Sequence, residues 1–215
     1  MLTPASLATP MPIASIRALE KEGLAKGLPL MQRAGTSAAR FLHNKIPRAS
    51  QVLALAGPGN NGGDALVAAR ELKALGHELI VVMPEHVAKA PADAQQARLD
   101  WLACGGILVQ DLPGHFSEAV IDGLFGIGLS RQLADPWQTI IDTVNGWQTQ
   151  VLALDIPSGL AADTGQPLGR PLQATWTLAF IAPSLAFDRE NSRRYFGECF
   201  VEDLDLQAGS DGKSP

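Results

Sequence analysis

The chain has 215 residues, of which 46% are hydrophobic and 18% are charged, and this balance excludes an intrinsically disordered protein. Lys and Arg number 17 against 22 Asp and Glu, which gives a formal net charge of −5 and disfavours nucleic acid as a partner. No apolar run approaches the roughly 20 residues that a membrane-spanning helix needs, so we expect no membrane partner.

The cysteines and the N-terminal segment predict a cytoplasmic protein. Cys104 and Cys199 are far apart and have no zinc-binding spacing, so we expect buried free thiols in a reducing compartment. Residues 1–16 lack both the basic start of a signal peptide and the Arg-rich character of a transit peptide. The histidines lie away from the motifs described below and are interpreted as surface residues: His43, His77, His86 and His115.

Two amphipathic helices are predicted at the start of the chain. The first covers Ile13 to Leu24, with Ile16, Leu19 and Leu24 spaced for one face. The second covers about residues 29–45, carries a stripe of apolar side chains, and ends before Pro47. Both precede the first predicted strand.

From residue 51 onward, short apolar strands alternate with helices. Residues 51–56 are almost wholly apolar, as expected for a strand that is buried on both faces. The further strands are predicted at 79–83, 107–109, 119–121, 151–154, 175–181 and 199–201, and the helices at 64–75, 91–103 and 135–147. In the last helix, Asp135 is predicted as the N-cap and Pro136 as the first helical residue.

This alternation predicts an α/β protein with a mostly parallel sheet that helices cover on both faces. Because the composition does not change along the chain, residues 1–206 are predicted to form one domain. Residues 207–215 are small and polar, which is typical of a flexible tail or linker.

The first candidate site follows the strand at 51–56. The sequence AGPGNNGGD (56–64) contains G-x-G-x-x-G, and Glu85 follows about 20 residues later, as in dinucleotide-binding loops. Asp64 disfavours an ordinary dinucleotide site, because it places a carboxylate where a pyrophosphate needs bare N–H groups. A glycine-rich turn with Asp64 as N-cap is the alternative, but four glycines beside Asn60 and Asn61 favour a ligand site.

Two further strands end in aspartate. Asp122 precedes Gly123, Gly126 and Gly128, whose backbone amides can converge on an anion, and Arg131 is near enough to meet a phosphate. Asp155 follows the strand at 151–154 and precedes a Pro-Ser-Gly turn (157–159).

The carboxyl ends of parallel strands lie at one edge of a sheet, so Asn61, Asp122, Asp155 and Ser158 are expected in one crevice. Oxygen donors without Cys or His suit a hard cation rather than zinc or copper. Two carboxyl groups in one cleft can also divide into a cation ligand and a general acid or base.

Three motifs, GPGNNGGD (57–64), DGLFGIGL (122–129) and DIPSGLAADTG (155–165), resemble in order and spacing the YjeF N-terminal domain, the NAD(P)H-hydrate epimerase family. LMQRAG (30–35) and FIAP (180–183) extend the resemblance over nearly the whole chain. It implies a Rossmann-like three-layer α/β/α sandwich, often a homodimer, that interconverts the R and S forms of hydrated NADH or NADPH. In bacteria this domain is commonly fused to an ADP- or ATP-dependent dehydratase, which restores NAD(P)H from the S form.

The resemblance also implies the roles of individual residues. Asp155 is expected beside the reacting ring, as the general acid or base. Asn61, Asp122 and Ser158 are expected to hold a potassium ion. The other expected contacts to the hydrated dinucleotide are Asn60, Asn61, Gly62, Gly63, Asp64, Gly126, Ile127, Gly128, Leu129, Ser130, Arg131 and Gln132.

Two positions depart from the family pattern, and two other functions stay open. Ala65 stands where the family usually has glycine, and Ser184 where it often has lysine.

One alternative function is a non-catalytic nucleotide-binding or scaffold module that kept the fold, as in mRNA-decapping scaffolds; the presence of both Asp122 and Asp155 disfavours it. The other is an NAD-dependent oxidoreductase that uses the G-x-G-x-x-G spacing, which Asp64 disfavours.

Overall fold

A computed structural model describes residues 2–84 and 90–206. Its strands form one eight-stranded sheet in the order β1-β8-β7-β6-β5-β2-β3-β4. Each neighbouring pair is parallel except β1 with β8. The strands are β1 (Thr3–Pro4), β2 (Gln51–Ala56), β3 (Glu78–Val82), β4 (Leu108–Val109), β5 (Ala119–Gly123), β6 (Gln150–Leu154), β7 (Trp176–Phe180) and β8 (Glu198–Glu202).

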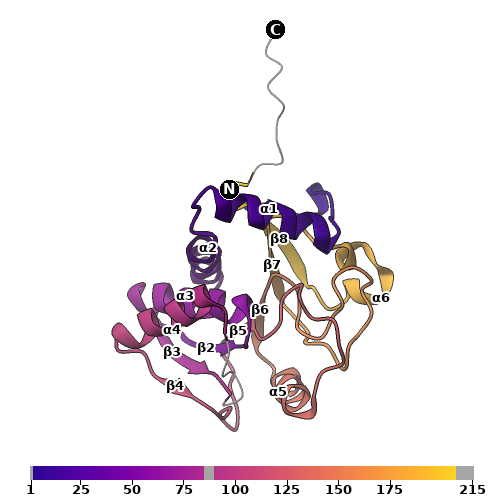
Figure 1. Ribbon diagram of the computed structural model, residues 1–215. Helices are drawn as coiled ribbons and strands as arrows, with labels where there is room; N and C mark the ends of the chain where they lie inside the picture. The colour runs from indigo at the N-terminus through magenta and orange to yellow at the C-terminus, as the bar shows by residue number, and fades with distance from the viewer. Residues whose placement is uncertain (1, 85–89, 207–215) are drawn as a thin grey trace.

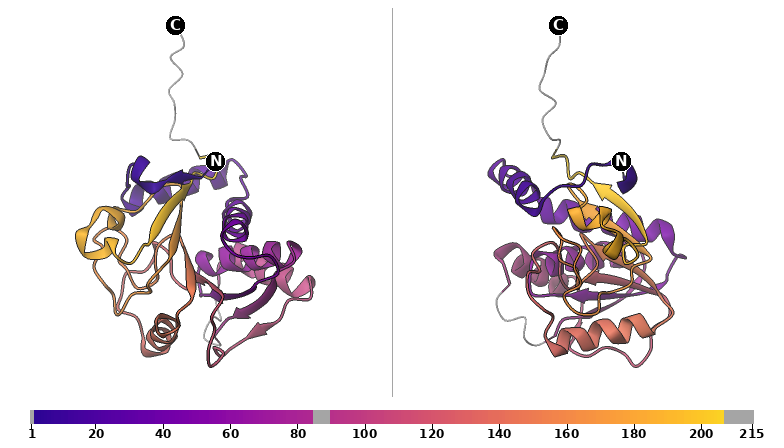
Figure 2. Two further views of the ribbon diagram at one scale, coloured as in Figure 1. Left: turned by 180° about the vertical axis from the view of Figure 1, so that it is seen from behind. Right: turned by 90° about the vertical axis from the view of Figure 1, so that its right-hand side faces the viewer.

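The α-helices are α1 (Ile13–Ala25), α2 (Leu30–Lys45), α3 (Asn60–Ala74), α4 (Ala92–Ala103), α5 (Asp135–Gly146) and α6 (Glu190–Arg193). Short 3₁₀ helices are η1 (Ala5–Leu7) and η2 (Leu185–Asp188). Figure 1 shows α2, α3 and α4 grouped on one side of the sheet and α5 on the other, while α1 crosses near β7 and β8. Figure 2 shows the same separation of α3 and α5 from two further directions.

The alternation of side chains along β2 produces these three layers. Val52 and Ala54 pack in the larger apolar core with buried residues of α2 and α3. Leu53 and Leu55 point to the opposite face and pack with Ile141 of α5. The predicted α/β/α sandwich, with helices on both faces of a mostly parallel sheet, is therefore confirmed.

The strand order reverses between β2 and β5. From β2 the chain proceeds outward through β3 to β4, then returns to β5 on the other side of β2 and continues outward to β8. In open parallel sheets, ligands bind beyond the carboxyl ends of the strands at such a switch point. The three candidate motifs follow β2, β5 and β6, which are adjacent at this point.

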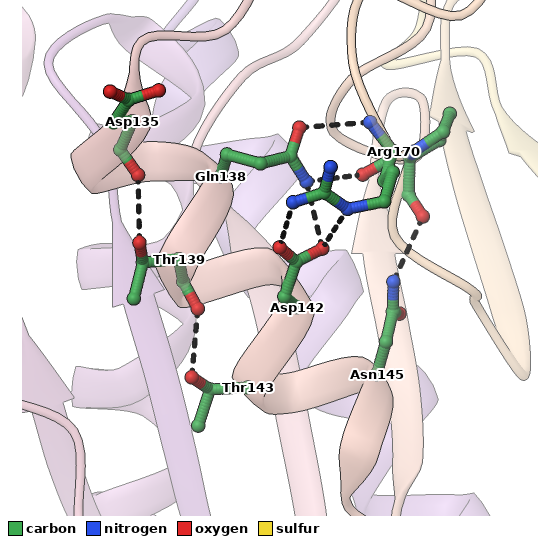
Figure 3. A network of polar contacts seen from close by, with 8 residues as sticks. Asp135, Gln138, Thr139, Asp142, Thr143, Asn145 and Arg170 are labelled. Atoms are coloured by element: carbon green, nitrogen blue, oxygen red, sulfur yellow. Dashed lines mark hydrogen bonds and ion pairs between the residues drawn. The ribbon is translucent and has the colours of Figure 1, made fainter.

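Polar contacts fix the connection between β6 and β7 against α5 (Figure 3). The side-chain oxygen of Gln138 accepts from the backbone N–H of Arg170 over 2.8 Å, and the Arg170 guanidinium pairs with Asp142. Two residues later, Leu172 donates its N–H to the carbonyl of Ser158 over 2.9 Å. The helix thereby steadies the turn that carries Ser158.

Two predicted helix starts are wrong. Helix α3 begins at Asn60, with Gly59 in the extended N-cap position, so Asp64 lies inside the helix and is not its N-cap. Helix α5 has Ala134 as N-cap, so Asp135 and Pro136 are already helical. Both helices begin on the N-terminal side of the aspartate that could have capped them. In the described structure neither N-cap residue makes a side-chain hydrogen bond to its helix.

Some side chains also lie elsewhere than predicted. Leu24 is 52% exposed, because α1 buries only Ile16 and Gly23. Cys104 is exposed and Cys199 half-buried, and both are free. His77 is buried rather than on the surface, because its Nε2 lies 2.8 Å from Nδ1 of His43 on α2.

Strand β1 and helix α6 are additional to the predicted elements. Glu85, His86 and the predicted tail at 207–215 lie outside the described residues. In the part of the chain that the structure describes, no helix combines the length and apolar character needed to cross a bilayer.

Candidate active site

A cavity of about 600 Å³ lies at the switch point, beyond the ends of β2, β5 and β6. We call it the switch-point cavity. Most of the predicted site residues line it: Asn60, Asn61, Asp64, Gly126, Ile127, Gly128, Leu129, Ser130, Arg131 and Asp155. The remaining lining residues are Arg17, Glu20, Pro58, Gly59, Pro91, Leu124, Phe125 and Phe180. The structure thus brings two of the three motifs and Asp155 of the third to one concave surface.

Asp155 is held in a strained backbone conformation. Its φ of 68° lies in the left-handed region, and the N–H of Ile156 bonds to the carbonyl of Leu154 over 2.8 Å, which closes a γ-turn around it. The backbone N–H of Ile127 donates to Asp155 Oδ2 over 2.8 Å. A strained backbone conformation of this kind persists only where the surrounding structure holds the residue in place. Such conformations are concentrated at functional sites.

The environment of Asp155 makes it weakly acidic. Burial raises its pKa to about 7, and the nearby carboxylate of Glu20 raises it as well. Hydrogen bonds from the backbone N–H groups of Ile127 and Phe180 oppose the rise by stabilising the charged form. At neutral pH this carboxyl group can therefore either donate or accept a proton.

Asp122 and Ser158 join the ends of β5 and β6. The Ser158 hydroxyl donates to Asp122 Oδ1 over 2.7 Å, and the Ser158 backbone N–H donates to Oδ2 over 2.9 Å. Both residues are fully buried. Burial raises the pKa of Asp122 to about 6, while the hydrogen bonds from Ser158 and from the N–H of Leu124 oppose this rise. The two side chains lie behind the surface of the switch-point cavity rather than on it.

The side chain of Asn61 is buried. Only 7% of the residue is exposed, and among the described residues neither its Oδ1 nor its Nδ2 has a hydrogen-bond partner. It lies beside the loop after β5, since a Cβ on Gly126 would be 3.4 Å from Asn61 Cγ. Asn61, Asp122 and Ser158 come from segments at the ends of the adjacent strands β2, β5 and β6 and offer amide, carboxylate and hydroxyl oxygens, so their chemistry fits a hard cation.

Asp64 differs from Asp155 in its burial. Burial holds its pKa well above the ordinary value, and the charges of Asp155 and Glu20 raise it further. Both effects favour the uncharged form of Asp64, which opposes an anion less than a carboxylate at the helix start would.

Several residues singled out in the sequence lie outside the switch-point cavity. Gly62 and Gly63 line a separate cavity of about 140 Å³, and Gln132 lines neither of the two. Ala65 is fully buried, and its methyl group faces Gly123 of β5. Ser184 is buried, and its hydroxyl has no partner in the described part of the structure. The roles predicted for Gly62, Gly63 and Gln132 stay predictions.

Sequence reasoning missed the contribution of α1. Arg17 and Glu20 reach the switch-point cavity from helix α1, which lies well before the first motif in the chain. The two residues are three positions apart, so they share one face of a helix, and this spacing was the sequence signal that could have linked them. The spacing does not show that α1 lies over the switch point, because that position depends on tertiary contacts.

Residues 27–186 match the family described as YjeF-related protein N-terminus. The chain belongs to this family. The matched residues lie within the domain predicted at 1–206, and the match confirms the resemblance drawn from the three motifs.

Curated relatives of this YjeF-related protein include two at about half identity. The NAD(P)H-hydrate epimerase of Bordetella pertussis (strain CS) is 52% identical over 198 residues, which cover 90% of this chain and 87% of the relative. The NAD(P)H-hydrate epimerase of Achromobacter xylosoxidans is 49% identical over 194 residues, with 90% and 92% covered.

A longer relative and a solved structure extend the comparison. The bifunctional NAD(P)H-hydrate repair enzyme Nnr of Coxiella burnetii is 36% identical over 197 residues, which are 89% of this chain and 40% of that enzyme. The crystal structure of the yeast protein ynu0, YNL200c, superposes with a TM-score of 0.73 at 22% identity, covering 86% of each chain. This similarity confirms the fold.

Proposed function

We propose that this chain is an NAD(P)H-hydrate epimerase, an isomerase that interconverts the R and S forms of hydrated NADH and NADPH. Two epimerases at about half identity, each aligned over nine-tenths of this chain, support the assignment. The observation that carries it is Asp155, a carboxyl group with a pKa of about 7 at the surface of the switch-point cavity.

The reaction inverts the carbon at position 6 of the nicotinamide ring. The lone pair of the ring nitrogen forms a C=N bond as the C6–O bond breaks, and the hydroxyl needs a proton to leave as water. Water then adds to the other face and loses a proton. Because Asp155 has a pKa of about 7, it is suited to general acid–base catalysis of a proton transfer of this kind.

The rest of the switch-point cavity suits a dinucleotide. In the described part of the structure no side chain caps the start of α3, so its first N–H groups can meet phosphate oxygens. Arg131 lies at the far end of the loop after β5 and provides a guanidinium for the same purpose.

We further propose that Asn61, Asp122 and Ser158 hold a potassium ion. The support is the oxygen-only donor set and the unpartnered Asn61 amide. A monovalent cation held by these residues would supply positive charge beside the Asp122 carboxylate. The sequence alone did not distinguish potassium from magnesium; the choice rests on the family resemblance.

Three further properties belong to the proposal. A homodimer is supported by exposed apolar side chains on adjoining elements at the β4 edge: Leu75, Leu99, Leu102, Ile107 and Val109. A dehydratase, fused or separate, is the expected partner, because relatives such as the Coxiella enzyme are bifunctional. A cytoplasmic location is supported by the two free cysteines.

The direct test separates the R and S forms of hydrated NADPH by chromatography and follows their exchange, once with potassium and once with sodium. Exchange well above the uncatalysed rate, faster with potassium, is the expected result. A folded protein that gives only the uncatalysed rate would contradict the assignment and favour a non-catalytic module.

A further inference from the structure

Helix α1 forms a wall of the switch-point cavity. Arg17 and Glu20 line the cavity together with the loop after β5 and Asp155. The helix lies close to this loop, because a Cβ on Gly128 would be 3.2 Å from Arg17 Nη2. None of the three sequence motifs includes this helix.

Glu20 occupies the inner side of this wall. It is half-buried, and with Asn60, Asp64 and Phe180 it lines both the switch-point cavity and an adjoining space of about 80 Å³. Burial raises the pKa of Glu20, and the charge of Arg17 on the same helix opposes the rise.

The charged and titratable groups around Glu20 come from every element packed near it. They are Arg17 on α1, Asp64 on α3, Asp93 on α4 and Asp155 after β6. Asp93 lines only the smaller space. Of the carboxyl groups that line the switch-point cavity, Asp64 is buried in α3, whereas Glu20 and Asp155 are half-buried. Glu20 and Asp155 are therefore the two carboxyl groups most open to the cavity.

Long-range contacts hold α1 in this position. The backbone N–H of Ile13, the first residue of the helix, donates to Asp163 Oδ1 over 2.8 Å, so the N-terminus is capped by a residue 150 positions away. Just before the helix, the N–H of Met11 donates to the carbonyl of Pro183 over 2.8 Å. Asp163 belongs to the third sequence motif, and this contact gives it a positioning role.

Epimerisation needs protons handled on two faces of one ring. The hydroxyl leaves from one face and water adds to the opposite face, so a single carboxyl group beside the ring is well placed for only one of the two events. A second proton-exchanging group on another wall of the same cavity meets this need.

We propose that Glu20 is the second acid–base residue of the epimerase, paired with Asp155; this rests on the function proposed above. In one direction, protonated Asp155 gives its proton to the departing hydroxyl as the C6–O bond breaks and the ring nitrogen forms C=N. Water then adds to C6 from the other face, and Glu20 takes the proton that it loses. The reverse reaction returns the protons, and exchange with solvent resets both groups between turnovers.

The test compares exchange of the R and S hydrates by the wild type, Glu20→Gln, Glu20→Asp and Glu22→Gln. Glu22 is the matched control, because it is on the same helix but exposed and paired with Lys26. We expect kcat to fall about 100-fold in E20Q with little change in KM, partial recovery in E20D, and the wild-type rate in E22Q. The pH profile of kcat should lose one limb in E20Q and the other in Asp155→Asn.

Each contrary result has a distinct meaning. E20Q exchanging the epimers at the rate of an active wild type would overturn the role of Glu20 alone. A slow E20Q with a lowered thermal midpoint and an unchanged pH profile would show a structural role and would also overturn it. A wild type without activity would overturn the proposed function, and the role of Glu20 with it.

Discussion

The backbone N–H of Ile127 donates to Oδ2 of Asp155 over 2.8 Å, so the glycine-rich loop after β5 orients the carboxyl group that follows β6. The two residues are 28 positions apart in the chain, but they meet because β5 and β6 are neighbours in the sheet. The same contact stabilises the charged form of Asp155 against its burial. It therefore helps to set both the position and the acidity of this group.

Replacing Asp155 by asparagine should remove proton transfer and keep the contact with Ile127, because the amide oxygen can still accept. We expect kcat for epimerisation to fall by about 10²–10⁴-fold with little change in KM. Steady-state rates of R-to-S exchange measure this. Asp111→Asn, at an exposed position, is the control and should match the wild type. An unchanged rate in folded D155N would exclude Asp155 as the acid or base.

The same variant should change how stability depends on pH. The pKa of Asp155 is about 7 in the folded protein against 3.8 ordinarily, so between these values the folded state binds more protons than the unfolded state. The contribution of Asp155 to the free energy of unfolding of the wild type therefore falls as pH rises from about 4 to about 7. D155N should be equally stable with the wild type near pH 4 and more stable at pH 8, by an amount on the order of 2–4 kcal/mol.

Urea unfolding at pH 4, 5.5 and 8 in potassium-free buffer measures this difference. Carboxyl groups distant from Asp155 contribute equally in both proteins, so the comparison reports Asp155 together with its effect on the coupled groups Asp64 and Glu20. A difference that stays constant across the three pH values would show that the folded protein does not raise the pKa of this group.

Gly126 should be required for the geometry around Asp155. A Cβ at this position would lie 2.6 Å from Asp155 Oδ2, so Gly126→Ala must displace the carboxyl group or the loop. We expect a loss of activity of about tenfold or more, because small displacements of a catalytic group are costly. Gly114→Ala, where an added Cβ meets nothing within 4 Å, is the control for the assay. Equal rates for G126A and the wild type would contradict the proposed geometry.

Potassium should stabilise the protein through Asn61, Asp122 and Ser158. Replacing sodium by saturating potassium should raise the free energy of unfolding by about 1–3 kcal/mol, as expected for a ligand that binds only the folded state. Asn61→Leu should abolish this response, while Asn44→Leu on the exposed face of α2 should keep it. Equal stability of the wild type in the two salts would argue against the cation site.

The sequence predicted the sheet and its ligand edge well because those signals are local. Residues 52–56 are apolar and buried on both faces of the strand, and the polar residues that follow them had to lie beyond its carboxyl end. Asp122 and Asp155 were likewise predicted at the carboxyl ends of apolar strands, and the sheet order makes these two strands neighbours. The start of α3 was placed at Asp64 because aspartate commonly caps helices, whereas the helix begins at Asn60 and contains Asp64.

The sequence did not predict the features that depend on distant contacts. Asp163 caps a helix that begins at Ile13, and no local pattern links the two. The placement of Arg17 and Glu20 in the switch-point cavity follows from that contact and from the packing of Gly23 near Leu206. His77 was expected on the surface, but the pairing with His43 buries it.

The most direct measurement of the central claim supplies a mixture of R and S hydrated NADPH to a purified dehydratase that accepts only the S form. The dehydratase alone should consume the S form quickly and the remainder at the slow uncatalysed rate of exchange. Addition of this protein should lead to rapid conversion of the whole mixture to NADPH, and addition of Asp155→Asn should not. If the R form persists in the presence of the folded wild-type protein, the chain is not an NAD(P)H-hydrate epimerase.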